Sequence, residues 1–236
     1  MGFVGYFLQK YLGKQRGLLF TSAFGSIVSS TAITISLAHQ SKKSDRINLF
    51  TSALILSILV MLIRIIIVVF IFASIFHFSF IAPALIMTVV ALIFFLYYYF
   101  FDLKFKKEEI KIDKEEDIKN PFELLPALKF GLIFIVVLYL VYFGEYYFGE
   151  MGAYFASGLA ALVDTDAVVL STLESFRALR MEAYLVINII AIAIIVNTLI
   201  KIFYIFIFGR KELFKKIFIP ILVISLAGFI PFFFFI

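Results

Sequence analysis

Long runs of apolar residues make up most of the chain, and shorter polar stretches separate them. Each run is long enough to cross a hydrocarbon core of about 30 Å as a helix rising about 1.5 Å per residue. An open segment can satisfy its backbone groups in lipid only as a helix. The pattern therefore predicts an all-α polytopic membrane protein with about seven hydrophobic helical segments. These segments are residues 17–38, 47–76, 78–101, 123–148, 153–175, 183–208 and 214–236.

Composition supports the same class. Hydrophobic residues form 64% of the 236 residues, which is more apolar surface than a water-soluble domain of this size can bury. The net charge of +5 lies mostly in loops, where Lys and Arg orient a membrane protein, so no nucleic-acid partner is expected. The sequence has no Cys, no P-loop, no HExxH motif and no nucleophile elbow. We therefore do not expect an enzyme.

One long polar stretch, residues 102–122, interrupts the apolar pattern and is rich in Lys and Glu. It predicts a charged cytoplasmic linker between a first membrane repeat, residues 1–101, and a second, residues 123–236. Together they would form one integrated domain in the cell membrane.

The two halves are related by an internal repeat. A shift of 135 residues places the hydroxyl triplet Ser29-Ser30-Thr31 on Asp164-Thr165-Asp166. With a two-residue length change in the next loop, Arg64 falls on Lys201. A polar triplet, a basic residue and a flanking glycine each recur at matching positions in the two halves, which together indicates a repeat. The other matched pairs are Gly17 with Gly152, Phe20 with Phe155, Val28 with Val163, Ala32 with Ala167, and Ser36 with Ser171.

Two arrangements of segments 17–38 and 153–175 are open. If every segment spans the membrane, the loop Lys and Arg residues divide rather evenly between the two faces. If these two segments are instead broken at their polar triplets and re-enter, nearly all these charges fall on one face, with Arg177 and Arg180 as the exceptions. The second arrangement makes the halves inverted copies, as in many secondary transporters.

The candidate site centres on Asp164 and Asp166, which lie in an otherwise apolar segment. An ionised Asp at the centre of a membrane helix costs about 2.5 to 3.5 kcal/mol, so partners, water or a cation must solvate it. Purely structural ion pairs are the alternative. An oxygen-only ligand set suits a hard cation, so bound Mg²⁺, Na⁺ or H⁺ is possible, and no other cofactor is expected. The predicted ion-binding residues are Asp164, Asp166, Ser29, Ser30, Thr31, Thr165, Ser171 and Asn197, with Asp164 and Asp166 as metal ligands.

Arg64 and Lys201 are the predicted charge partners, because each lies inside a hydrophobic segment. Two acids and two bases balance, which fits structural neutralisation. It also fits exchange, in which Lys201 releases a carboxylate when a cation arrives, whereas Arg64 stays protonated.

The chain resembles the uncharacterised membrane domain usually fused behind the MgtC/SapB domain, which is associated with magnesium transport. Two departures are Ser26 and Ala161, which replace the family's glycines before the triplets. The resemblance rests on Phe3-Val4-Gly5-Tyr6, Leu12-Gly13-Lys14-Gln15-Arg16-Gly17, Val28-Ser29-Ser30-Thr31-Ala32, Ser36-Leu37-Ala38, Asn120-Pro121-Phe122-Glu123-Leu124, Phe130-Gly131, Asp164-Thr165-Asp166-Ala167, Ser171 and Asn197-Thr198-Leu199-Ile200-Lys201.

The resemblance implies a membrane protein of cation homeostasis. Since the MgtC/SapB part and the helix that precedes Phe3 in the family are absent from this sequence, a second copy or a separate membrane partner is expected to complete the first half. The function expected is a secondary transporter or exchanger of a hard cation. The alternatives are a non-transporting regulatory or structural subunit and, with less support, an anion carrier that uses Arg64 and Lys201.

Overall fold

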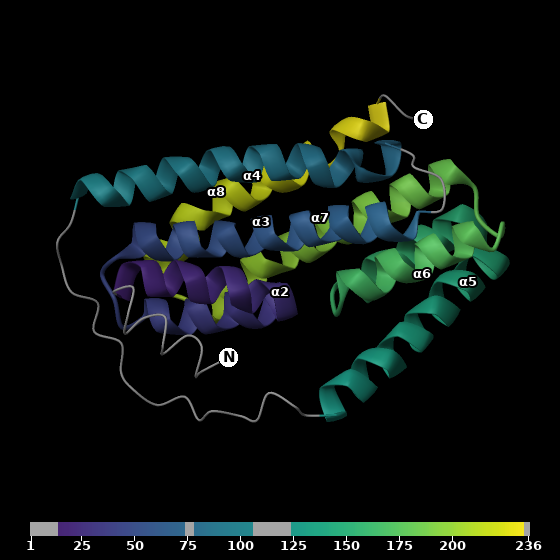
Figure 1. The fold of residues 1–236 in the computed structure, drawn as a ribbon, viewed down its shortest axis with the longest axis horizontal. Helices are drawn as coiled ribbons and strands as arrows, with labels where there is room; N and C mark the ends of the chain where they lie inside the picture. The colour runs from purple at the N-terminus through teal and green to yellow at the C-terminus, as the bar shows by residue number, and fades with distance from the viewer. Residues whose placement is uncertain (1–13, 74–77, 106–123, 234–236) are drawn as a thin grey trace. The chain divides into compact units, whose positions relative to one another are not determined.

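The computed structural model describes residues 14–73, 78–105 and 124–233, and these residues form helices and no strand (Figure 1). The predicted all-α membrane fold is confirmed. The helices long and apolar enough to cross a membrane include Ile47–Phe72, Phe78–Phe100 and Ala183–Phe208. The elements are α2 (Lys14–Ser41), α3 (Ile47–Phe72), α4 (Phe78–Phe105), α5 (Leu124–Ala161), α6 (Thr165–Arg177), α7 (Ala183–Phe208), α8 (Lys211–Ala227) and the 3-10 helix η1 (Ile230–Phe233).

The chain packs as two compact units. Within the described residues, unit 1 comprises 14–61, 89–105 and 201–223, and unit 2 comprises 62–73, 78–88, 124–200 and 224–233. The chain changes from one unit to the other within α3, α4, α7 and α8. Each unit combines pieces of both sequence halves, so the repeat boundaries remain a prediction. Most of the predicted linker lies outside the described residues.

In unit 1, α2 is broken at Ser29, whose φ of −159° and ψ of 107° are extended rather than helical. The predicted break in segment 17–38 is therefore present, although Gly17–Ser41 has the length and composition of a membrane span. The residues on either side of Ser29 form the two arms of a first hairpin, defined here as residues 14–41 (Figure 1).

Hydrogen bonds to α3 fix the direction of both arms. In the first arm, Ser22 Oγ donates to the Ala53 carbonyl at 2.6 Å and Ser26 Oγ donates to Ser57 Oγ at 2.8 Å, so this arm runs parallel to α3. Ser57 Oγ also donates to the Ser30 carbonyl at 3.3 Å, where the second arm begins. The second arm then leads through a short loop to the start of α3, so it runs antiparallel to α3.

In unit 2, α5 bends sharply at Gly149, which has a φ of 62° and a ψ of −154°. This left-handed backbone region favours glycine because it has no Cβ. The residues after the bend continue to Ala161, and α6 begins at Thr165 after a short turn. Residues 150–177 form a second hairpin (Figure 1).

Two asparagines of α7 hold the first arm of the second hairpin. Asn188 Nδ2 donates to the Tyr154 hydroxyl at 3.0 Å, and Asn197 Nδ2 donates to the Ala161 carbonyl at 2.8 Å. The later asparagine of α7 bonds to the later residue of the arm, so this arm runs parallel to α7. The first hairpin has the same relation to α3, so the repeat is present in the fold.

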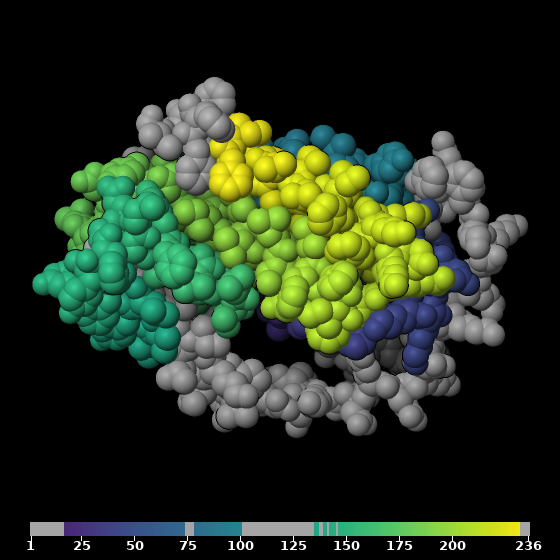
Figure 2. Space-filling model, turned by 180° about the vertical axis from the view of Figure 1, so that it is seen from behind, coloured from purple at the N-terminus to yellow at the C-terminus, as the bar shows by residue number. Residues whose placement is uncertain are grey.

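Apolar side chains also lie at the surface. On α8, Phe218, Ile219, Val223 and Leu226 are exposed, and Figure 2 shows this helix on the surface of the molecule. Ile67, Phe70 and Ile71 are also exposed on α3, which is long and apolar enough to cross a membrane, and such side chains suit contact with lipid. The protein is therefore embedded in a membrane.

Arg210 lies between α7 and α8 and bonds to the loop between α2 and α3, and all of these residues belong to unit 1. Its guanidinium donates to the Ser44 carbonyl at 3.0 Å and to the Asp45 carboxylate at 2.8 Å, both in the loop that leads to α3. Its backbone N–H donates to Ser41 Oγ at 3.2 Å. Its Nε donates to Glu212 at 2.9 Å.

We expect the stability of unit 1 to fall in acid through Glu212. The pKa of Glu212 is lowered, chiefly by a hydrogen bond from its own backbone N–H and further by Arg210. A carboxyl whose pKa is lower in the folded state stabilises it above the unfolded pKa of about 4.3, and this stability is lost as the pH falls through the folded pKa. The melting temperature of the detergent-solubilised protein should drop below about pH 4.3. Glu212→Gln should reduce the drop, and a profile parallel to wild type would refute the assignment.

Candidate functional site

The turning points of the two hairpins are built alike. Asp164, with a φ of −152° and a ψ of 120°, has nearly the backbone conformation of Ser29. Each side chain caps the helix that follows: Asp164 Oδ1 accepts from the Asp166 backbone N–H at 2.8 Å, and Ser29 Oγ accepts from that of Ala32 at 3.2 Å. Ser and Asp are both strong N-cap residues. The equivalence of Ser29 and Asp164, inferred from the sequence, therefore extends to structure.

Asp166 lies in the first turn of α6, and its carboxylate accepts a hydrogen bond from the Arg64 guanidinium of α3, forming an ion pair. Both residues belong to unit 2. Their side chains are 17% and 24% exposed, respectively, so the pair is mostly withdrawn from the surface. The partly positive N-terminus of α6 also favours the carboxylate.

At the break between α5 and α6, the Ala160 carbonyl still accepts from the Asp164 N–H at 3.0 Å, as in a continuous helix, and it also accepts from the Val163 N–H at 3.0 Å. The Ala161 carbonyl accepts from Asn197, which is buried. The amide nitrogen of Asn197 therefore supports the turn that presents the aspartates. Its predicted role as an ion ligand remains untested.

The hydroxyls of α6 differ in their environments. Ser171, predicted as an ion ligand, is buried and its Oγ donates to the Val168 carbonyl of its own helix at 2.9 Å. Thr165 is also buried, with 3% of its surface exposed. Its Oγ1 has no hydrogen-bond partner within the described residues.

The other predicted residues lie in unit 1. Ser29 to Thr31 form the tip of the first hairpin, and the Ser30 carbonyl accepts from both Thr34 and Ser57. Lys201 of α7 is fully buried, with its Nζ 3.4 Å from Met61 Sδ. Met61 follows Ser57 by one helical turn and therefore lies on the same face of α3.

The structure thus groups Asp164, Thr165, Asp166 and Arg64 in unit 2, supported by Asn197. The hydroxyl triplet and Lys201 belong to unit 1, so a joint site with the aspartates remains a prediction. Among the described residues, no group of three or more His, Cys, Asp or Glu side chains could hold a metal ion. The site instead combines carboxylates, a hydroxyl and a guanidinium.

Sequence reasoning missed the serine contacts between the first hairpin and α3. Ser22 and Ser26 are four residues apart, and both bond to α3. The spacing of Ser22, Ser26 and Ser30 would have indicated a polar face on this apolar segment.

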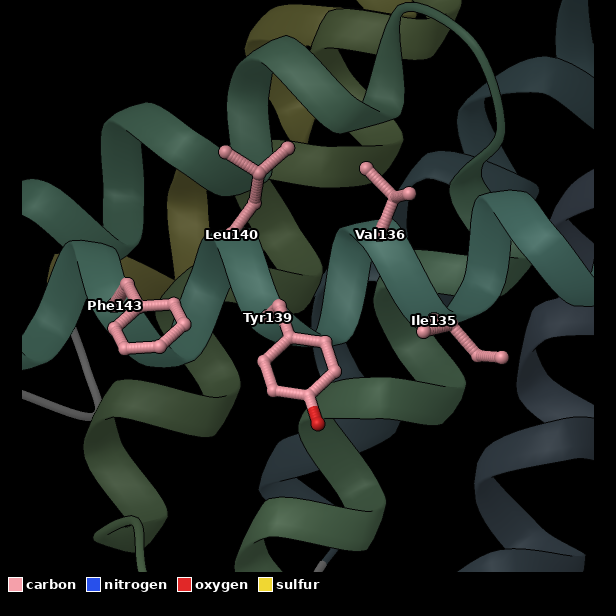
Figure 3. A pocket seen from close by; sticks show the side chains of 5 residues that line it. All are labelled: Ile135, Val136, Tyr139, Leu140 and Phe143. Atoms are coloured by element: carbon pink, nitrogen blue, oxygen red, sulfur yellow. The ribbon is translucent and has the colours of Figure 1, made fainter.

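A separate hollow lies along the first part of α5 and is lined by Ile135, Val136, Tyr139, Leu140 and Phe143 (Figure 3). These side chains are all exposed and carry no charge. An apolar lining of this kind suits acyl chains rather than a dehydrated ion.

Comparisons with known proteins agree with the membrane fold and assign no activity. Residues 1–209 match the family described as Domain of unknown function (DUF4010). An uncharacterized protein of Aquifex aeolicus (strain VF5) is 31% identical over 205 residues, which cover 86% of this chain and 87% of that protein. No solved structure matches the chain. Since the family match extends over most of its length, the chain belongs to the DUF4010 family of uncharacterised domains.

Proposed function

We propose that this protein is a secondary transporter of a hard cation and that Asp164 and Asp166 hold the cation. The observation that carries the proposal is the broken second hairpin, which presents Asp166 beside Arg64 and Asp164 at the N-cap of α6. Broken helices with ionisable side chains form the ion and substrate sites of many secondary transporters. No enzymatic step or resident cofactor is part of the proposal, because the cation is the substrate.

Arg64 can compensate the charge of the site when no cation is bound. In the present state its guanidinium compensates the Asp166 carboxylate. A cation that enters would displace the guanidinium from Asp166. The carboxylate is then compensated in both states, which avoids the large penalty of a buried unpaired charge. Asp164 would hold the start of α6 in place during this exchange.

The resemblance to membrane domains fused to MgtC/SapB supports a role in cation homeostasis. The bias of loop Lys and Arg supports placement in the cell membrane with residues 102–122 on the cytoplasmic side. A second copy of the chain, or another membrane protein, is the proposed partner.

A non-transporting regulatory or structural subunit is the second candidate function. It is favoured by a specific observation: each aspartate already has a structural task. Asp164 caps α6, and Asp166 pairs with Arg64. In that case the charges would only hold the second hairpin against α3.

Asp164→Asn separates the two functions, because Asn caps a helix as well as Asp but carries no charge. We expect cation uptake into proteoliposomes to fall to background in Asp164→Asn and Asp166→Asn, while Asp164→Asn keeps its melting temperature. Ser175→Ala is the matched control, since that hydroxyl bonds within its own helix and is not a predicted ion ligand, and it should transport normally. Normal transport by Asp164→Asn would contradict the proposal. Absence of flux in the wild type, with a co-purifying membrane protein, would support the structural subunit.

A further inference from the structure

Two segments of unit 1 carry a concentration of positive charge. They are residues 41–46, which lead from α2 to α3, and residues 209–216, which lead into the first turns of α8. Together they hold seven basic and two acidic residues. A net charge of +5 therefore remains after both carboxylates are fully compensated, and this equals the net charge of the whole chain.

Hydrogen bonds hold the two segments side by side. The backbone N–H of Arg210 donates to Ser41 Oγ at 3.2 Å, and its guanidinium donates to the Ser44 carbonyl at 3.0 Å. The two lysines between these serines therefore lie beside the start of α8. Further along α8, Lys216 Nζ donates to Asn48 Oδ1 at 2.6 Å. The exposed lysines of both segments, called the basic patch below, are Lys42, Lys43, Lys211, Lys215 and Lys216.

The exposed side of α8 continues from the basic patch into apolar side chains. Lys211, Lys215, Ile219 and Val223 follow one another at intervals of four residues, which places successive members next to each other along the helix surface. Ile219 is 63% exposed and Val223 is 39% exposed, on the helix surface that Figure 2 shows. A molecule with an anionic head and an apolar tail matches this order of charged and apolar side chains.

The corresponding connection of unit 2 lacks this charge. Residues 178–182, between α6 and α7, contain one basic and one acidic residue, Arg180 and Glu182. Both connections follow a hairpin, so their place in the fold does not explain the difference. Helix stability does not explain it either, because the dipole of α8 favours acidic side chains in its first turn, where Lys211 stands.

We infer that the basic patch binds the headgroup of an anionic phospholipid, whose acyl chains lie along the exposed apolar side chains of α8. Lysines next to a lipid-facing helix attract anionic headgroups, and their long stems let the ammonium reach the headgroup level. Free phosphate would use the charge but would leave Ile219 and Val223 without a partner. The bound lipid would connect the two segments that Arg210 also connects. This inference does not depend on transport.

The test titrates the purified full chain in dodecyl maltoside micelles with dioleoyl phosphatidylglycerol or dioleoyl phosphatidylcholine and follows the melting temperature. We expect a saturable rise with phosphatidylglycerol alone, because a ligand of the folded state stabilises it. Each lysine near anionic lipid strengthens the attraction about fivefold, so Lys211→Gln with Lys215→Gln should raise the apparent Kd about 25-fold. Arg177→Gln with Arg180→Gln is the matched control, which removes two exposed charges from unit 2 and should keep the wild-type Kd.

Three results would overturn the inference. An equal rise with both lipids would show that the headgroup is not recognised, since their acyl chains are identical. An unchanged Kd in the Lys211→Gln, Lys215→Gln variant, or an equal loss in the arginine control, would show that the basic patch is not the site. An equal rise with inorganic phosphate would identify a free anion as the ligand.

A second variant tests the loop between α2 and α3 separately. Lys42→Gln with Lys43→Gln should also weaken the binding of phosphatidylglycerol, because these lysines lie beside the start of α8. Unchanged binding in this variant would contradict a site shared by the two segments. None of these measurements involves flux or the aspartates of the second hairpin, so a negative result here leaves the proposed transport function to its own test.

Discussion

Replacing Arg64 by Met is expected to destabilise the protein by about 3 kcal/mol, at the lower end of the range for breaking a buried ion pair. The change leaves the Asp166 carboxylate, 17% exposed, without its guanidinium partner. The lower end applies because the pair is not fully buried, and because the N-terminus of α6 still favours the negative charge. Equilibrium unfolding in mixed micelles would measure the loss.

A double-mutant cycle separates the ion pair from the packing of its two side chains. Arg64→Met with Asp166→Leu should recover most of the stability lost by Arg64→Met alone, because no uncompensated charge remains. Arg64→Lys is the matched control that keeps the charge, and Lys stands at the equivalent repeat position, residue 201. It should be the mildest single change. A coupling energy near zero would show that the two charges do not stabilise each other.

The helices could be predicted from the sequence where apolar runs end at charges or at a glycine. The predicted segment 183–208 coincides with α7, because Glu182 precedes it and Gly209 and Arg210 follow it. The predicted segments 123–148 and 153–175 differ from the structure. Instead of a loop between them, Gly149 alone provides the bend, and α5 continues to Ala161. Hydrophobicity does not reveal this, because a helix that bends at one glycine remains apolar on both sides.

The breaks at the two polar triplets could also be predicted, because Ser, Thr and Asp satisfy freed backbone groups. The partners of each side chain could not be predicted in the same way. That Asn197 bonds to the Ala161 carbonyl, and that Asp166 pairs with Arg64, depends on which helices pack together. Likewise, Ser171 turned out to donate to its own helix, whereas Thr165 did not. Residue type identified the candidates, and the path of the backbone determined their partners.

Gly152→Ala should be more damaging than any other single methyl addition in the second hairpin. The bend at Gly149 brings the Gly144 carbonyl oxygen onto the position that a Cβ at residue 152 would occupy, and Phe148 Cβ to 2.6 Å from it. Contacts this short require the backbone to move, since the carbonyl cannot rotate away as a side chain can. We expect a loss of about 3 kcal/mol, seen as a lower melting temperature and a lower yield of monodisperse protein.

Gly158→Ala is the control, because it makes the same substitution in the same arm without a clash. Its Cβ would lie 3.7 Å from Ile192 Cγ2, an ordinary contact distance. Since alanine favours a helix over glycine by about 1 kcal/mol, this variant should be as stable as wild type or more stable. Equal stability of the two variants would mean that residues 144 and 152 do not approach closely. The bend that directs the first arm of the second hairpin toward Asp164 would then have to be held by contacts other than this glycine pair.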